Sequence, residues 1–161
     1  MSDPSRQLSL LERREIEARI AGPLIRAFIA EFGRERTLQV VERTISTLAH
    51  TAGSELATRS GNQELTTFSA CIETWKAGGA LEIELLEQSN ERLFFNVTRC
   101  RFAEMYQSLG LADLGACLSC CRDSALVQGF NSSIHLTRTQ TIMEGAPYCD
   151  FRFQALEPDP D

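Results

Sequence analysis

The chain has 161 residues, of which 43% are hydrophobic and 24% are charged, and its formal net charge is −6. This length supports one domain with a hydrophobic core, so we expect a single domain over residues 1–161 with disordered tails at 1–8 and 155–161. The acidic balance argues against a nucleic-acid partner, because arginine clusters such as Arg13 and Arg14 are diluted by glutamates and are interpreted as solvated helix faces. No stretch approaches the roughly 18 apolar residues that span a bilayer, and the N-terminus lacks a signal-peptide pattern, so we expect a cytoplasmic protein without membrane contact.

The first half of the sequence has the periodicity of long helices. A capping box that begins at Ser9 predicts the start of the first helix, and Gly33 predicts its end. Because proline lacks the amide hydrogen, we expect a kink or a new helix start at Pro23. Two further helices are predicted over about 36–58 and 63–76, and we expect the apolar stripe of the first of these to face the core. In the first helix, apolar residues recur at every fourth position and form one stripe: Ile16, Ile20, Leu24, Phe28 and Phe32.

Beyond residue 80 the period changes to two, which predicts strands. Segments 81–85 and 93–97 form a predicted hairpin, and two strands are expected over about 134–138 and 148–154. Between them, helices are predicted over about 100–109 and 111–121, and a loop at 128–131. Strands segregated from helices in this way indicate an α+β domain, with N-terminal helices packed on an antiparallel sheet of about four strands. The alternation in the last strand puts one set of residues on one face and a second set on the other: Cys149, Phe151 and Phe153, against Asp150 and Arg152.

Reactive side chains concentrate at 120–123 and 138–152. A cysteine thiol becomes a nucleophile once a nearby positive group lowers its pKa, and Cys120 and Cys149 are each followed by an acid and an arginine. Each of the two is therefore either a nucleophile or a small buried hydrophobic residue. The sequence holds no glycine-rich nucleotide loop and no repeated CxxC spacing, so we expect neither a cofactor nor a metal.

Arg138 lies within a predicted strand, so its guanidinium needs a negative partner. That partner is either Asp123, Glu144 or Asp150, or the carboxylate of a substrate.

Two other residues have a structural and a functional interpretation. His135 is either a general base or an ordinary hydrogen-bonded side chain. Glu104 falls one helical turn after Cys100, which permits either a paired site or a surface glutamate.

With these residues in view, the sequence resembles the L-2-amino-thiazoline-4-carboxylic acid hydrolase family. The resemblance implies a small hydrolase that opens a cyclic isothiourea acid to an N-carbamoyl amino acid. The family also looks distantly similar to the domain of vinyl reductases and heme or nitric-oxide sensors, which folds as helices against an antiparallel sheet. The likeness covers about 75–153 and rests on five segments: Val97–Tyr106, Cys120–Asp123, Gly129–Asn131, Leu136–Gly145 and Cys149–Arg152.

Some relatives in that wider group bind structural zinc through a glutamate and cysteines that precede a final Gly-x-x-x-Cys. Gly145 and Cys149 match this ending, but the upstream ligand positions hold Arg138 and Thr141. We therefore expect no zinc here.

Carried onto this chain, the resemblance leaves two mechanisms open. Either a thiolate, Cys120 first and Cys149 second, attacks the ring carbon between nitrogen and sulfur, or Asp123 or Glu144 activates a water molecule. In both cases Arg138 binds the carboxylate of the substrate.

The remaining predicted contacts surround this attack. Thr139 or Thr141 hydrogen-bonds the ring substituents, an acid stabilises the amidine nitrogen, and His135, Asp150 and Glu104 complete the substrate-binding set. The expected partner is a small heterocyclic acid, and the sequence allows a homo-oligomer. The alternative function is a non-catalytic small-molecule-binding or sensor domain of the same fold.

Overall fold

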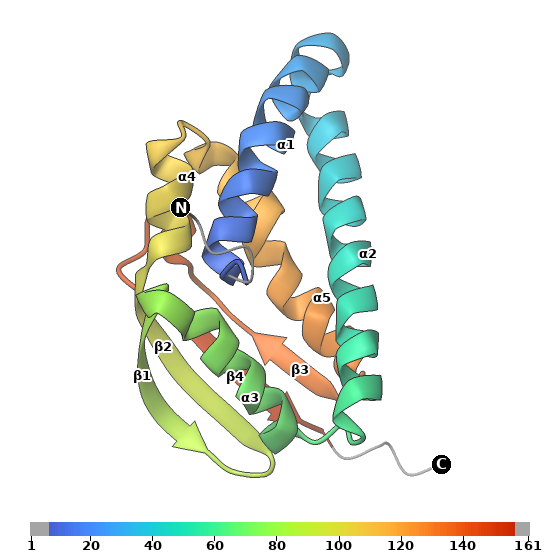
Figure 1. Ribbon diagram of the computed structural model, residues 1–161, viewed down its shortest axis with the longest axis vertical. Coiled ribbons are helices and arrows are strands. Elements are labelled where there is room, and N and C mark those ends of the chain that lie inside the picture. The colour runs from blue at the N-terminus through green and yellow to red at the C-terminus, as the bar shows by residue number, and fades with distance from the viewer. Residues whose placement is uncertain (1–6, 157–161) are drawn as a thin grey trace.

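A computed structural model describes residues 7–156, so most of the tails predicted at 1–8 and 155–161 lies outside the described residues. Five α-helices and a four-stranded antiparallel sheet form an α+β domain, which confirms the predicted class (Figure 1). Three helices come first: α1 (Leu10–Phe32), α2 (Arg34–Ser60) and α3 (Leu65–Lys76). They are followed by β1 (Leu81–Gln88), β2 (Arg92–Cys100), α4 (Arg101–Ser108), α5 (Cys121–Phe130), β3 (Ile134–Thr137) and β4 (Cys149–Ala155).

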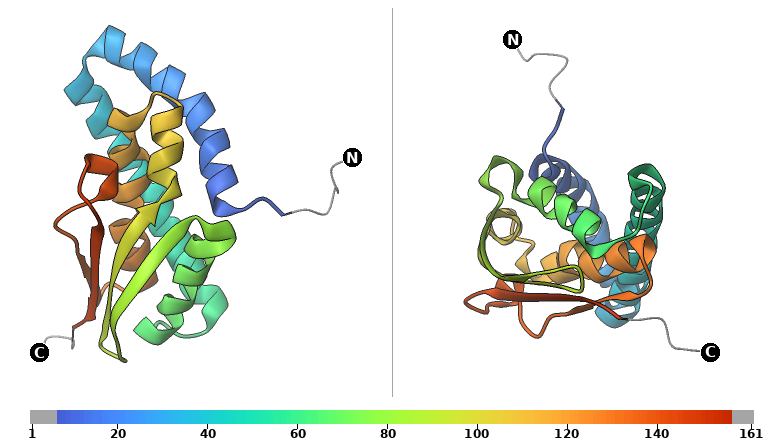
Figure 2. Two further views of the ribbon diagram at one scale, coloured as in Figure 1. Left: turned by 90° about the vertical axis from the view of Figure 1, so that its left-hand side faces the viewer. Right: turned by 90° about the horizontal axis from the view of Figure 1, so that it is seen from below.

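The sheet has the order β1-β2-β4-β3, so the last strand of the chain lies between the first hairpin and β3. Phe95 of β2 pairs with Leu85 of β1 on one side and with Phe151 of β4 on the other. Helices α3 and α5 lie on the same side of this sheet, as two turned views show (Figure 2). The hairpin and the two later strands agree with the predicted strands.

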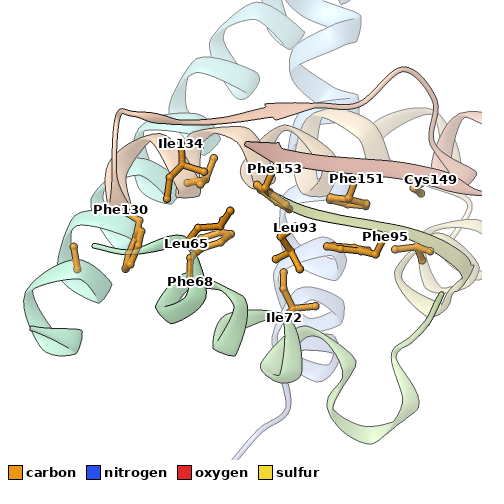
Figure 3. Packing of buried hydrophobic residues seen from close by; sticks show 13 residues of the cluster. Leu65, Phe68, Ile72, Leu93, Phe95, Phe130, Ile134, Cys149, Phe151 and Phe153 are labelled. Atoms are coloured by element: carbon orange, nitrogen blue, oxygen red, sulfur yellow. The ribbon is translucent and has the colours of Figure 1, made fainter. Parts of the chain in front are cut away.

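The main hydrophobic core fills the space between the sheet and these helices (Figure 3). Along β4 the residues Cys149, Phe151 and Phe153 are buried while the residues between them are half-exposed, so the predicted two-faced strand is confirmed. The Phe95 and Phe151 rings stack with their centroids 4.9 Å apart. Burial of each phenylalanine contributes about 2–3 kcal/mol, which makes this aromatic layer the main anchor of the sheet.

Helix α1 differs from the prediction at Pro23. It runs without interruption through Pro23, so no new helix starts there. Pro23 is exposed, where solvent can satisfy the carbonyl oxygen that a proline leaves without a donor. The residues that pack against the domain are Ala18, Gly22 and Ile25, whereas the predicted apolar stripe is exposed to solvent. A second hydrophobic cluster, which includes Tyr106, lies beneath this packed face.

Helix α5 continues to Phe130, so the loop predicted at 128–131 is wrong. Gly129 suggested a turn, but it serves close packing instead: a Cβ atom there would lie 2.0 Å from the carbonyl oxygen of His50 in α2. A Cβ atom at Gly53 of α2 would lie equally close to the carbonyl oxygen of Leu126. The two glycines therefore let the backbones of α2 and α5 approach each other directly.

The segment before α5 is helical, as predicted, but it is not one regular helix. A 3₁₀ turn at Ala112–Leu114 leads into a π-helical segment, η3 (Ala116–Cys120), which joins α5 without a break. π-helical segments are rare and occur frequently at functional sites.

Candidate active site

A cavity of about 130 Å³ lies between the helices and the sheet. This is close to the roughly 150 Å³ of an apolar cavity that accommodates benzene, so a single small ring fits. One part of the wall is apolar, with Trp75 and Phe151 as its largest side chains. The polar side chains and thiols of the wall come from α1, η3, α5, β2, β4 and the end of β3: Arg14, Cys100, Ser119, Cys120, Arg122, Asp123, Arg138 and Cys149.

A largely buried ion pair between Asp123 and Arg138 lies in this cavity wall. Arg138 directly follows β3, and its Nη1 donates a hydrogen bond of 2.5 Å to Oδ2 of Asp123. Its Nη2 donates to the carbonyl oxygen of Cys120 at 3.0 Å, and its guanidinium lies 4.9 Å from the centroid of the Phe151 ring. Of the alternatives open in the sequence, Asp123 is thus the partner of Arg138.

The π-helical segment and the start of α5 position this pair. Cys120 is the last residue of η3, and its carbonyl oxygen points to Arg138 rather than only along the helix. Asp123 lies in the first turn of α5, which continues directly from η3. The strand end and the helix start therefore meet at one charge pair.

Burial dominates the ionisation of Asp123. Removal from water raises the pKa of the Asp123 carboxyl above its ordinary value, and the positive charge of Arg138 offsets only part of this effect. The pKa of Arg138 is raised, because the attraction of Asp123 outweighs the opposing effect of burial. A carboxyl with a raised pKa in a cavity is better suited to accept and return a proton than a solvated aspartate.

Three thiols face the same cavity, and burial keeps them protonated. It raises the pKa of Cys100 to about 11. The pKa of Cys120 is raised well above its ordinary value by burial and then by the charge of Asp123, and Arg138 only partly counteracts this. Burial also raises the pKa of Cys149, whose sulfur accepts a hydrogen bond from the N–H of Ile142 at 3.2 Å. Because the thiolate is the nucleophile, the surroundings of these sulfurs weaken the case for a cysteine attack.

A second pair of guanidinium groups lies elsewhere on the cavity wall. The side chains of Arg14 from α1 and Arg122 from α5 are only 18% and 17% exposed. Both contact the carboxylate of Glu17, at 2.7 Å from Arg14 and 3.4 Å from Arg122. Burial, and then the neighbouring Arg14, lower the pKa of Arg122. Two arginines that share one carboxylate leave an excess of positive charge, which suits an anionic group of a ligand.

The sequence interpretation missed Arg14, because it treated the adjacent arginines as a solvated face. A local signal was present: Arg14 lies three residues after Leu11 and four before Ala18, and both of these pack in the second cluster. Residues at this spacing share one helix face, so Arg14 points to the domain while Arg13 is exposed.

Several predicted site residues lie away from the cavity wall. Thr141 is buried, and its hydroxyl donates to Glu144 at 2.7 Å and accepts the N–H of that residue, which closes the short turn Ile142–Glu144. Glu144 itself is exposed. Asp150 accepts hydrogen bonds from the N–H and hydroxyl of Thr139 and from the N–H of Gln140. Burial works to raise the pKa of Asp150, but these hydrogen bonds lower it overall.

His135 and Glu104 are both exposed. His135 pairs in the sheet with Gln154, and Glu104 forms an ion pair with Arg99 at 2.7 Å. Of the predicted site residues, the fold therefore brings Cys120, Asp123, Arg138 and Cys149 to the cavity and leaves the others outside its wall.

Within residues 7–156, no group of three or more His, Cys, Asp or Glu side chains is arranged to hold a metal ion. No helix in the same range is long and apolar enough to cross a membrane.

An α+β domain that surrounds a ring-sized cavity with a buried carboxylate and three arginines has the features of a small-molecule site. Comparison with protein families agrees: the family model of L-2-amino-thiazoline-4-carboxylic acid hydrolase matches residues 13–153. The chain therefore belongs to this hydrolase family, and the match extends the resemblance through the helical first half to include Arg14. A search among curated proteins finds no match.

Proposed function

We propose that this protein hydrolyses a small cyclic isothiourea or amidine acid of the 2-amino-thiazoline-4-carboxylate type and opens its ring to an N-carbamoyl amino acid. The family membership supports a hydrolase. The observation that carries the proposal is the Asp123–Arg138 pair in the wall of a cavity that also holds the excess positive charge of Arg14 and Arg122.

The cavity suits such a substrate in size and in charge. A single small heterocycle fits the volume of about 130 Å³. Its carboxylate would bind Arg14 and Arg122, since Arg138 is already neutralised by Asp123. The family resemblance implied that Arg138 binds this carboxylate, whereas the second arginine pair takes that role here. The apolar wall at Phe151 would cover the face of the ring.

The water route fits these surroundings better than the thiolate route. Asp123 accepts a proton from water while the water oxygen forms a bond to the ring carbon between nitrogen and sulfur. The carbon–sulfur bond then breaks, and Asp123 returns the proton to the departing sulfur, which leaves as a thiol. The remaining hydroxyl proton moves to the ring nitrogen, so substrate plus one water gives the N-carbamoyl product. Arg138 holds the Asp123 carboxylate in position throughout.

Turnover of 2-amino-thiazoline-4-carboxylate, followed by mass spectrometry, tests this proposal. Addition of one water to the substrate is expected, and Asp123→Asn should reduce the rate about 10²–10⁴-fold, the usual contribution of a general base. Cys120→Ala should retain turnover within a few-fold. Asp113→Asn is the matched control, since Asp113 is an exposed carboxylate paired with Arg26 and Arg34 outside the cavity wall.

Circular dichroism and thermal melting of Asp123→Asn distinguish a catalytic defect from loss of the fold. Full activity of a folded Asp123→Asn variant would contradict the water route, and loss of activity in Cys120→Ala would restore the thiolate route.

A binding or sensor domain is the second candidate, and one observation favours it. The Asp123 carboxylate is held by Arg138 of the same chain, so the pair can act as a fixed recognition element. In that case heterocyclic acids would raise the melting temperature of the protein without any ring opening.

A further inference from the structure

Helix α1 carries apolar side chains on two opposite faces. One face packs on the domain through Ala18, Gly22 and Ile25. The other face is defined here as the outer stripe, whose members are between 49% and 64% exposed: Ile16, Ile20, Leu24, Phe28 and Phe32. The rings of Phe28 and Phe32 lie next to each other, with their centroids 6.2 Å apart.

Helix geometry places the centre of the outer stripe directly away from the domain. Ile20 and Leu24 are each two residues from the packed Gly22, and two residues correspond to about 200° of rotation around the helix axis. A helix that is apolar around most of its circumference is normally covered on all sides. Within the described residues, the outer stripe is not covered by the chain itself.

The area of the outer stripe matches a dimer contact. Half-exposed side chains of this size offer on the order of 100 Å² each, so the stripe presents about 500 Å² per chain. Two such surfaces together offer about 1,000 Å² before flanking residues are counted, which is about the smallest area of a specific interface.

We propose that a second copy of this chain covers the outer stripe. The two α1 helices would pack antiparallel, and the two-fold axis would pass between them at the level of Gly22 along the helix. In this register Ile20 of one copy faces Leu24 of the other, and Ile16 faces Phe28. Each of these pairs occurs twice, as two-fold symmetry requires.

The charges at the two ends of the stripe select this orientation. Arg13 and Glu31 are both exposed and are separated by about five full helical turns, so they lie on the same side of α1. In the antiparallel register Arg13 of each copy faces Glu31 of the other. A parallel arrangement would place like charges opposite each other and would be disfavoured.

A membrane surface is a poorer occupant of this face. Helices that lie on membranes carry lysine and arginine along their polar side. Here α1 has no excess of positive charge, since its four glutamates balance its four arginines, and the chain has a net charge of −6.

Sedimentation analysis of the full chain at concentrations up to about 100 μM tests the proposal. The wild-type protein should have twice the chain mass of 18.0 kDa, and the double variant Ile20→Glu/Leu24→Glu should have the single mass. The matched control is Leu85→Glu/Leu86→Glu on β1, where the two leucines are equally exposed (55% and 50%). This control should remain dimeric.

A charge exchange tests the orientation. Arg13→Glu and Glu31→Arg should each weaken the dimer about 10-fold, and the combined variant should regain wild-type affinity. The proposal is overturned if the wild-type chain is monomeric, including a monomer that binds anionic vesicles, or if the Leu85/Leu86 control also dissociates. It is likewise overturned if the combined variant does not regain the dimer affinity that each single variant loses.

Discussion

Replacement of Arg138 by methionine should destabilise the fold, and the loss should grow with pH. The change removes the 2.5 Å partner of Asp123, the hydrogen bond to the Cys120 carbonyl and the contact with the Phe151 ring. Breaking a buried pair by removing one partner costs about 3–5 kcal/mol, because the remaining charge stays buried. That is a large part of the roughly 5–15 kcal/mol of a typical domain.

The pH dependence follows from the raised pKa of Asp123. A carboxyl whose folded-state pKa exceeds its unfolded value contributes stability that is present below the unfolded pKa and is lost as the pH rises through the folded pKa. Without Arg138 this pKa rises further, so where Asp123 is protonated the variant loses only the hydrogen bond to the Cys120 carbonyl and the Phe151 contact. The full loss develops only where Asp123 is ionised in the wild type.

Urea unfolding of the two proteins at about pH 3.5, below the ordinary aspartate pKa, and at about pH 8 measures this difference. Arg19→Met is the control, since the exposed Arg19–Glu15 pair should contribute less than about 1 kcal/mol at either pH. A loss for Arg138→Met that is below about 1 kcal/mol, or equal at the two pH values, would refute the reasoning about the buried pair.

Two further substitutions test the packing and the second arginine pair. Gly129→Ala should lower the free energy of unfolding by more than about 2 kcal/mol, because the new Cβ atom would lie 2.0 Å from the His50 carbonyl oxygen. The control is Ser124→Ala at an exposed position of the same helix, which should change this free energy by less than about 0.5 kcal/mol. If the proposed reaction is correct, Arg122→Met removes a contact to the substrate carboxylate, so KM should rise about 10-fold or more with little change in kcat. A fall in kcat alone would count against this role of Arg122. Arg43→Met, an exposed change on α2, serves as its control in steady-state kinetics.

Local signals in the sequence predicted the parts of the fold that depend on local interactions. The capping box at Ser9 forms as expected, and the alternation in β4 correctly separates Cys149 and Phe151 from Asp150. Asp123 could be included among the partners of Arg138 because a charge at the end of a half-buried strand needs an opposite charge.

Features that depend on distant parts of the chain could not be predicted in this way. Gly129 is a typical turn residue unless it is known that the α2 backbone lies against it. Helix α1 has two apolar faces, and periodicity detects the one with the larger side chains, the outer stripe. The face that packs on the domain consists of small residues around Gly22, which allow close contact with Leu111. Arg14 joins the cavity only because this smaller face is the one that packs.

The π-helical segment η3 has a consequence for how the length of this part of the chain can vary. Leu114 and Leu118 pack in the cluster beneath α1, whereas Val127 and Phe130 of the same continuous helical run pack in the core of the sheet. The wider π-helical turn at Ala116–Cys120 sets the rotation about the helix axis between these two packed ends. A deletion of one residue there would turn Asp123 by about 100° relative to the preceding turn. We therefore expect natural variants of this chain to accept insertions or deletions in the β1–β2 turn more readily than between Ala116 and Asp123.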